Sequence, residues 1–332
     1  MFFQFRVDER HRDYLRFLWF EKGDYTSDPV EYRMKVHLFG ATSSPGCSNY
    51  GLRQCADDYE SEVGQNAANF VRSNFYVDDG LKSVATVKEA VELISASREL
   101  CAKDGIRLHK FASNVKDVLD VVAPTECSGS DMPKEQQLLK CMDTVERPLG
   151  IHWNIENDTL SVRVILQDSP LTRRGVLSTV SSVYDPLGFI APIVMVGKLI
   201  LQALTRDLAD WDDPVPDNLL PQWQKWRTEI IELRHLHVDR CLKPAQFGYL
   251  TNVELHHFSD ASSLGYGQCS YIRSTDDNGK VHVAFLMGKS KVAPLREVTI
   301  PRLELTAAVV SVRISTLLSR ELEYENMTQI FW

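Results

Sequence analysis

Residues 70–80 form the stretch that most constrains the fold of this chain. Their sequence, FVRSNFYVDDG, combines aromatic and β-branched residues and ends in two adjacent carboxylates and a glycine. This pattern predicts a strand that leads into a tight turn. Because hard divalent cations prefer carboxylate oxygens, Asp78 and Asp79 are candidate metal ligands. The alternative is a surface hairpin in which the Asp-Asp-Gly turn is simply solvated, since turns are rich in these residues.

The composition is that of a globular protein with more than one domain. At 332 residues the chain is long enough for two or three domains, and its 44% hydrophobic and 25% charged residues exclude disorder and collagen-like repeats. The net charge of -8 argues against nucleic-acid binding through overall charge, although local basic faces remain candidates. One such stretch is 289–320, for which a solvated helix face is the alternative.

Cysteine usage and the two apolar segments bear on the compartment. The seven cysteines are scattered and include no C-x-x-C pair, which argues against zinc or a disulfide framework and favours an intracellular setting, cytoplasm or nucleus. Charges within the first ten residues indicate that no signal peptide is present. The apolar stretch 187–205 contains Pro192 and Lys198, so we expect a buried helix there and no membrane partner.

Turn signals and hydrophobic periodicity predict the order of the remaining elements. Thr86 and Glu89 form a capping box at the start of a helix that ends at Gly105. The other expected elements are two strands joined by a charged turn over 2–20, a helix from about 48 to 63, a strand over 106–111, a loop over 123–135, a hairpin around 157–158, three helices between 172 and 233, strands over 253–260, 264–272 and 281–287, and a helix opening near Pro301.

The last segment supplies a second pair of candidate acids. Asp260 ends a predicted strand, and Glu304 lies one position round from the buried face of the last helix, beside small residues that leave room for a carboxylate. His256 and His257 precede Asp260. Without cysteine or histidine partners they are expected to be core or edge histidines and not zinc ligands.

Six elements, in this order, resemble the BEL/Pao class of long-terminal-repeat retrotransposons. The first four resemble elements of retroelement reverse transcriptases, and the last two are most similar to the BEL/Pao class. Along the chain they are the nucleotide-cradling loop at 39–45, the Y-x-D-D box at 76–79, the glycine-then-lysine element at 105–110, the primer grip at 149–150, the thumb-like segment 177–189 and the segment 300–305. One element alone is modestly specific, whereas the ordered set is strongly so.

The resemblance implies an α+β protein in three parts. Residues 1–165 would form a partial reverse-transcriptase palm whose fingers are missing, 166–250 a mainly helical thumb and connection, and 251–332 the N-terminal half of an RNase H-like α/β domain. The parent enzyme would be an RNA-directed DNA polymerase with RNase H. Its partners would be an RNA or DNA template-primer, dNTPs and other parts of the pol polyprotein.

The resemblance also implies roles for single residues. The metal ligands and catalytic residues would be Asp78, Asp79, Asp260 and Glu304, with two Mg²⁺ (or Mn²⁺) ions at each site in the parent enzyme. Asp79 would be a second ligand or would tune the site. The substrate contacts would be Phe2 at the sugar 2′ position, Gly40 beside the incoming nucleotide, Val77 at the primer end and Lys110 near the leaving phosphate.

Two departures from the family limit the expected activity. The family places another metal-binding aspartate before the position of Met1, and the next RNase H acid after Trp332. We therefore expect weak or absent metal binding and little or no polymerase activity, and enzyme status stays open. The alternatives are a non-catalytic nucleic-acid-binding or domesticated protein, and an element remnant without a stable product. Part of the family region is called the Pao retrotransposon peptidase, but no Asp-Thr/Ser-Gly loop supports that chemistry.

Overall fold

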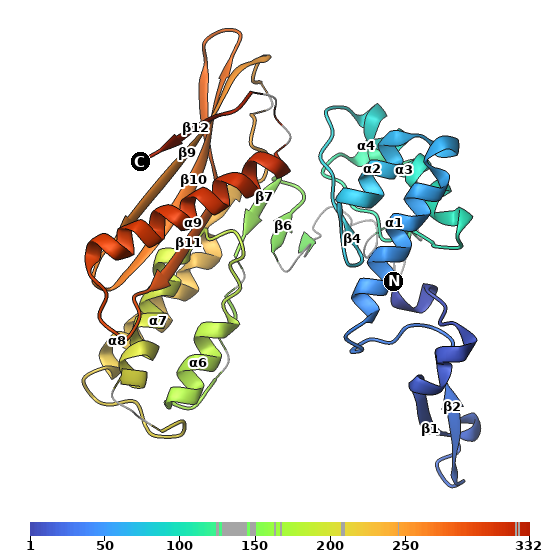
Figure 1. The fold of residues 1–332 in the computed structure, drawn as a ribbon, viewed down its shortest axis with the longest axis horizontal. Helices are drawn as coiled ribbons and strands as arrows, with labels where there is room; N and C mark the ends of the chain where they lie inside the picture. Colours follow the sequence, from blue (N-terminus) through green and yellow to red (C-terminus); the bar gives the residue numbers. More distant parts are fainter. Residues whose placement is uncertain are drawn as a thin grey trace. The chain divides into compact units, whose positions relative to one another are not determined.

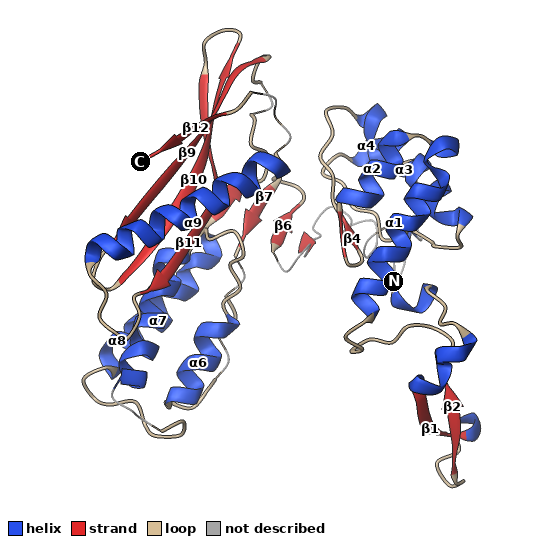
Figure 2. Cartoon of the chain, viewed as in Figure 1, coloured by secondary structure: helices blue, strands red, loops and turns tan. Residues whose placement is uncertain are grey.

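The chain folds into two compact units, Met1–Thr144 and Val145–Trp332. A computed structural model describes residues 1–123, 126–127, 145–146, 151–162, 164–166, 168–206, 210–244, 246–322, 324 and 326–332. Figures 1 and 2 show the elements of each unit. The expected boundaries near 165 and 250 stay predictions.

The first unit is built on three helices that share one apolar core. Small residues on α1 and α2 let the helices approach closely, and Leu100 and Cys101 of α3 complete the core. The elements are η1 (Phe2–Gln4), η2 (Glu9–Leu15), β1 (Arg16–Phe20), η3 (Glu21–Gly23), β2 (Pro29–Arg33), α1 (Ser44–Val63), α2 (Gln65–Ser73), β3 (Phe75–Tyr76), β4 (Asp79–Gly80), α3 (Val87–Lys103) and α4 (Lys116–Leu119).

The predicted capping box of α3 is confirmed. The Thr86 Oγ1 atom accepts a hydrogen bond from the Glu89 amide at 3.2 Å, and Glu89 Oε2 accepts from the Ala85 amide at 3.0 Å. Gly105 ends the helix with φ +72°, a left-handed conformation that glycine adopts without steric cost. Local sequence signals therefore fix both ends of this helix.

Two strand predictions in this unit are wrong. Residues 70–73 belong to helix α2, because Ala67, Ala68 and Val71 line one buried face at helical spacing, and this packing overrides the strand preference of the sequence. Residues 106–111 form no regular strand. There the Gln4 side chain bonds to both backbone groups of Arg107, at 2.6 and 3.3 Å, in place of a neighbouring strand.

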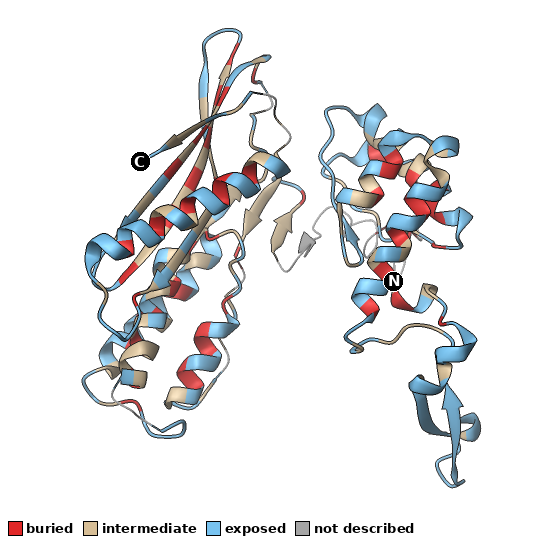
Figure 3. Ribbon diagram, viewed as in Figure 1, coloured by how far each residue is buried: buried red, intermediate tan, exposed pale blue. Residues whose placement is uncertain are grey.

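The N-terminal prediction is also wrong in part. Residues 2–15 contain two short 3-10 helices, and the one strand within 2–20, β1, pairs with β2 in an antiparallel ribbon. The residues of this ribbon are exposed except Phe20, which is half-buried. Figure 3 shows β1 and β2 in the colour of exposed residues. The expected charged turn is present at Asp8, whose carboxylate accepts the Arg10 amide at 2.9 Å. This local hydrogen bond starts a helical turn that continues to Leu15, so the strand after it is shorter than the sequence predicts.

The second unit holds two sheets and a helical group. Its first sheet has the order β5-β6-β7-β8, with every neighbouring pair antiparallel. The elements are β5 (Val145–Glu146), β6 (His152–Asn154), β7 (Thr159–Ser161), α6 (Arg173–Ser182), α7 (Ala191–Arg206), α8 (Leu220–Glu232), η6 (Leu233–His235), β8 (His237–Asp239), β9 (Leu250–Ala261), β10 (Gly265–Asp276), β11 (Val281–Val292), α9 (Ile300–Glu321) and β12 (Thr328–Phe331).

The predicted hairpin at 157–158 is confirmed and is tied to β8. Asp158 has φ +50° in the turn, and its carboxylate accepts two hydrogen bonds from Arg240, at 2.5 and 2.8 Å. Trp153 Nε1 donates to the same carboxylate at 2.9 Å. One aspartate therefore joins the hairpin to the residue that follows β8.

The three predicted helices between 172 and 233 are confirmed as α6, α7 and α8. They share a core in which the Trp223 and Trp226 rings stack at 5.1 Å, and Trp226 Nε1 donates to the Ile193 carbonyl at 2.7 Å. Gly197 of α7 lies against the Trp226 ring, where a Cβ atom would collide. Among the described helices, α7 included, none is both long enough and apolar enough to cross a membrane.

The second sheet has the order β11-β10-β9-β12. Strands β9, β10 and β11 are antiparallel neighbours, whereas β12 runs parallel to β9 and is reached through helix α9. Helix α9 packs on one face of the sheet through Ile314 and Leu318, which share a core with Val253 and Leu255 (Figure 1). The expected strands and last helix are thus confirmed, and the mixed α/β arrangement is consistent with an RNase H-like domain.

Gly188 gives a test of the packing of β11 against the segment before α7. Its φ is +79°, and a Cβ atom there would collide with the carbonyl oxygen of Gly288, whose amide donates to the Leu187 carbonyl at 2.8 Å. We expect Gly188→Ala to destabilise the second unit by at least about 2 kcal/mol, from backbone strain plus the collision. Urea unfolding followed by tryptophan fluorescence measures the loss.

Gly279→Ala is the matched control. Gly279 has a similar φ of +75°, but no atom lies within 4 Å of the position that an added Cβ would take. The substitution should therefore cost about 1 kcal/mol, from conformation alone. Equal losses for the two variants would show that the contact with Gly288 is unimportant.

Candidate functional site

The two acids of the first unit lie at the tip of the β3–β4 hairpin. Tyr76 pairs with Asp79, which leaves Val77 and Asp78 as the two turn residues. Both carboxylates are exposed. An edge-on contact between the Phe70 ring of α2 and the Phe75 ring of β3, with centroids 5.2 Å apart, packs the hairpin against the helix. The structure thus presents Asp78 and Asp79 side by side on a short, anchored turn.

Val77 carries backbone strain at this turn. Its φ is +57°, a left-handed conformation that is a genuine outlier for a β-branched residue. Such conformations cost of order 1–3 kcal/mol and cluster at binding and catalytic sites. Gly80 relieves crowding on the other side, because a Cβ there would collide with the Phe75 ring.

Two of the four expected substrate-contact residues lie together. The Phe2 ring, 8% exposed, meets the Phe39 ring edge-on at 4.9 Å, and Gly40 follows Phe39 directly. Gly40 has φ +86° and no atom within 4 Å of its missing side chain, so its backbone is open to close approach.

The other expected contacts are less closely grouped. Lys110 is exposed and has φ +62°, at the end of the segment that Gln4 ties to the N-terminal residues. Its side chain is therefore available to a ligand. Val77 lies in the hairpin turn itself. The expected primer grip at 149–150 lies outside the described residues.

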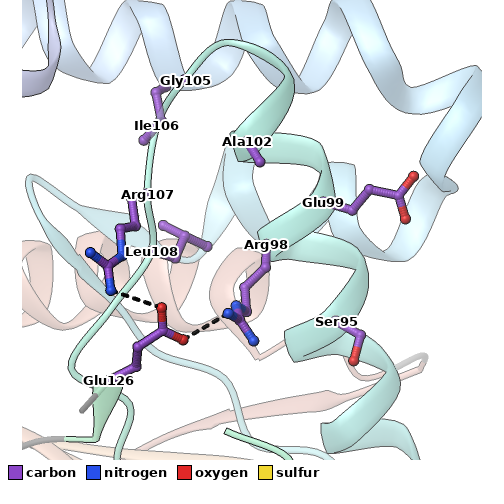
Figure 4. Close-up of a pocket in the computed structure, with 9 residues that line it drawn as sticks. All are labelled: Ser95, Arg98, Glu99, Ala102, Gly105, Ile106, Arg107, Leu108 and Glu126. Atoms are coloured by element: carbon purple, nitrogen blue, oxygen red, sulfur yellow. Dashed lines mark hydrogen bonds and ion pairs between the residues drawn. The ribbon is translucent and has the colours of Figure 1, made fainter. Parts of the chain in front are cut away.

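A cleft of about 510 Å³ lies elsewhere in this unit, between α3 and residues 105–108 (Figure 4). Glu126, only 8% exposed, accepts hydrogen bonds from Arg98 at 2.7 Å and from Arg107 at 3.0 Å. None of the expected site residues lines this cleft. The carboxylate is a structural tie between α3 and the following segment. Sequence analysis misses Glu126 because it falls in a stretch whose composition indicates only a polar loop.

Asp260 lies near the C-terminal end of β9, opposite Gly267 of β10. Its carboxylate is exposed and accepts the Ala261 amide at 2.7 Å. Side chains alternate along a strand, and Leu255 and His257 are buried on the face that α9 covers. The Asp260 and Phe258 side chains therefore project from β9 on the face opposite to the one that α9 covers.

Glu304 reaches the same end of the sheet from α9. The helix ends shortly before β12, and β12 begins beside Glu254, in the N-terminal half of β9. The start of α9 must therefore lie toward the C-terminal end of β9, where Asp260 is. Leu303 and Ala307 are buried and Glu304 is exposed, as the sequence predicts. The two acids share one end of the sheet but approach it from different elements.

The two histidines before Asp260 have structural partners. His257 is fully buried and hydrogen-bonded at both ring nitrogens, to Ser270 and Gln329. His256 lies 3.1 Å from a carboxylate oxygen of Glu254, and this contact is the main cause that lowers the pKa of Glu254. Both therefore act as core or edge residues of the sheet.

The carboxylates fit a divalent cation only in part. Asp78 with Asp79, and Asp260 with Glu304, offer hard oxygen ligands of the kind that Mg²⁺ and Mn²⁺ prefer. Within the described residues, no group of three or more histidine, cysteine, aspartate or glutamate side chains is placed to hold a metal ion. Each pair could offer a divalent cation at most two carboxylate ligands.

Comparison with known proteins concerns the second unit. No curated protein matches the chain. Residues 172–332 match the family model of the Pao retrotransposon-like RNaseH-like domain. The matched stretch contains the helices α6–α8, the sheet β9–β12 and both acids of the second candidate site. The match supports a Pao/BEL retrotransposon pol region for this part of the chain.

Proposed function

We propose that the chain is a piece of a Pao/BEL-type retrotransposon polymerase polyprotein that acts on nucleic acid. In this proposal the second unit carries RNase H-like structure, and the first unit carries reverse-transcriptase palm structure. The observation that carries the proposal is the topology: β12 is parallel to β9, so Asp260 at the end of β9 and Glu304 near the start of α9 lie toward the same end of the sheet. The family match over 172–332 supports it.

Asp260 and Glu304 would hold a divalent cation at this end of the sheet. A bound cation of this kind polarises a phosphate oxygen and lowers the pKa of a bound water. Both side chains are exposed, so an RNA–DNA hybrid can reach them. Two carboxylates alone leave most coordination positions to water, and further ligands are needed for tight binding. We therefore propose weak metal binding and little hydrolysis by these residues alone.

In the first unit, Asp78 and Asp79 would play the corresponding part in nucleotidyl transfer. The strained Val77 turn keeps both carboxylates at the hairpin tip, and Gly40 beside Phe39 leaves open backbone for an incoming dNTP. A template-primer would complete the set of substrates. The palm assignment rests on the order of the sequence elements and on this hairpin.

The metal-binding part of the proposal is tested with Mn²⁺. Added to the full chain, Mn²⁺ at millimolar concentration should broaden the NMR amide signals around Asp78 and around Asp260 and Glu304, because the paramagnetic ion relaxes nearby nuclei. A millimolar dissociation constant corresponds to about 4 kcal/mol of binding free energy. Asp260→Asn should remove the effect in the second unit, and Asp78→Asn in the first.

Asp277→Asn is the control for the second unit. Asp277 is an exposed acid in the β10–β11 turn, at the opposite end of the same sheet. Its substitution should leave the broadening at Asp260 unchanged. Signals around Asp260 that stay sharp at all Mn²⁺ concentrations, or that broaden equally in Asp260→Asn, would contradict the proposed site.

A second function, nucleic-acid binding without chemistry, is favoured by the basic residues of 289–320. Five cations there are exposed and make no ion pair within the described part of the chain: Lys289, Lys291, Arg296, Arg302 and Arg313. The net charge of the chain is -8, so such binding depends on this local patch. It requires neither carboxylate pair.

This alternative predicts binding of an RNA–DNA hybrid that weakens steeply with salt. Arg302→Gln combined with Arg313→Gln should lower the slope of log affinity against log salt by about 2, since each phosphate contact contributes about 0.9. The control is Arg174→Gln, because Arg174 is exposed but already paired with Asp212. Fluorescence anisotropy measures both. The alternative fails if no binding appears at low salt, or if Asp260→Asn abolishes it.

A further inference from the structure

His257 is the side chain through which β9 contacts both of its neighbouring strands. It is fully buried on the face covered by α9. Its Nδ1 atom lies 2.8 Å from Ser270 Oγ on β10, and its Nε2 atom lies 2.8 Å from Gln329 Oε1 on β12. The ring also stacks on Phe331 at 5.0 Å, and the His257 carbonyl accepts the Trp332 amide at 2.9 Å.

Gln329 extends this contact to the helix. Its Oε1 atom also accepts from Ser315 Oγ at 2.7 Å, and its Nε2 atom donates to Ser319 Oγ at 2.8 Å. Strand β12 pairs with β9 in this sheet. The His257–Gln329 contact is a buried polar link between β12 and the sheet interior, whereas the hydrogen bond from Trp332 Nε1 to His256 Nδ1 at 3.2 Å lies on the opposite face.

The hydrogen-bond partners assign the state of the imidazole. A neutral ring has one donor nitrogen and one acceptor nitrogen. Because Gln329 Oε1 is an acceptor, Nε2 carries the proton and Nδ1 accepts from the Ser270 hydroxyl. Gln268 Nε2 is a buried donor without a hydrogen-bond partner among the described residues, and Gln268 Oε1 lies 3.0 Å from Ser270 Oγ. If the amide is flipped, Nε2 takes the position of Oε1 and donates to Ser270 Oγ. The Ser270 hydroxyl is then free to donate to His257 Nδ1.

The surroundings of His257 offer no charge to stabilise an imidazolium. The side chains that contact it or its hydrogen-bond partners are neutral: Gln268 and Ser270 from β10, Gln329 and Phe331 from β12, and Ser315 from α9. The charged and titratable groups nearest along the sheet, Glu254, His256 and Arg273, belong to the opposite face. Burial is the main cause that lowers the pKa of His257; the hydrogen bond that His257 donates to Gln329 acts in the opposite direction, and the nearby His256 lowers the pKa further.

We propose that His257 is a proton-dependent latch that fixes β12 beside β9. The neutral side chain holds the strand, and acidification releases it. Since the Ser259 amide donates to the Trp332 carbonyl, release of β12 also loosens the backbone one residue before Asp260. Only this last consequence, for the metal site, rests on the proposed function.

The direction of the pH effect follows from the protonation states. A released histidine titrates near 6.5, whereas the docked one resists protonation. The docked state is therefore fully stable above about pH 6.5 and loses stability as the pH falls through that value toward the lower pKa of the docked form. Between pH 7.5 and 5.5 the loss amounts to at most about tenfold in the docking equilibrium.

Hydrogen exchange at residues 328–332 of the full chain tests the latch. Protection factors, corrected for the intrinsic pH dependence of exchange, should fall by up to about tenfold from pH 7.5 to 5.5 in the unchanged protein. In His257→Gln they should no longer depend on pH, because glutamine can donate to Gln329 but does not titrate. The control is His282→Gln, which alters a histidine on β11 whose ring lies against Phe247 and not against residues 328–332, and which should keep the pH dependence.

Gln329→Ala gives an independent measurement if His257→Gln does not fold. It should reduce protection of 328–332 at pH 7.5, since β12 loses its buried polar link to the sheet interior. Equal protection of the unchanged protein at both pH values, a persisting pH dependence in His257→Gln, or full protection in Gln329→Ala would each overturn the latch. The measurement needs neither metal nor nucleic acid, so its outcome is separate from that of the Mn²⁺ experiment.

Discussion

The parallel pairing of β12 with β9 is the constraint on which the second unit depends. Parallel strands cannot be joined by a tight turn, so the chain must cross the sheet between β11 and β12, and α9 is that crossing. The helix must begin near the end of the sheet at which β9 finishes. This single topological requirement places Asp260 and Glu304, forty-four positions apart in sequence, toward the same end of the sheet.

The same pairing explains why the interior of this sheet is partly polar. A short edge strand held only by apolar contacts can slip along its neighbour, and a slip of one residue turns every side chain to the other face. The bond from His257 to Gln329 is made in one register alone. A connected polar network of this kind specifies an arrangement at the cost of burying polar groups, and it stays stable only while every member is paired. Protonation of His257 leaves its Nδ1 atom unable to accept the hydrogen bond from Ser270, so the network is no longer fully paired.

The sequence predicts the parts of this structure that local chemistry decides. The capping box at Thr86, the turn at Asp158 and the strand over 253–260 each follow from signals within a few residues, and each is confirmed. Residues 70–73 have the sequence of a strand but are helical. Their contacts with α1 and α3 decide this, and a local sequence pattern does not contain those contacts. Likewise, a structural role for the histidines can be expected from the sequence, but the partner of His257 lies seventy-two positions away in β12.

Both candidate acid pairs lie where regular structure ends, and this has a physical reason. Inside the sheet, polar side chains such as His257 are buried and fully engaged, so they cannot meet a substrate. At an element's end the backbone still fixes the side chain, while one side is open to solvent. Of the two candidate sites, the Val77 turn costs more conformational free energy, because a left-handed backbone at a valine persists only where neighbouring packing imposes it. The Phe70–Phe75 contact supplies that packing, so two aromatic rings behind the turn hold Asp78 and Asp79 in place at its tip.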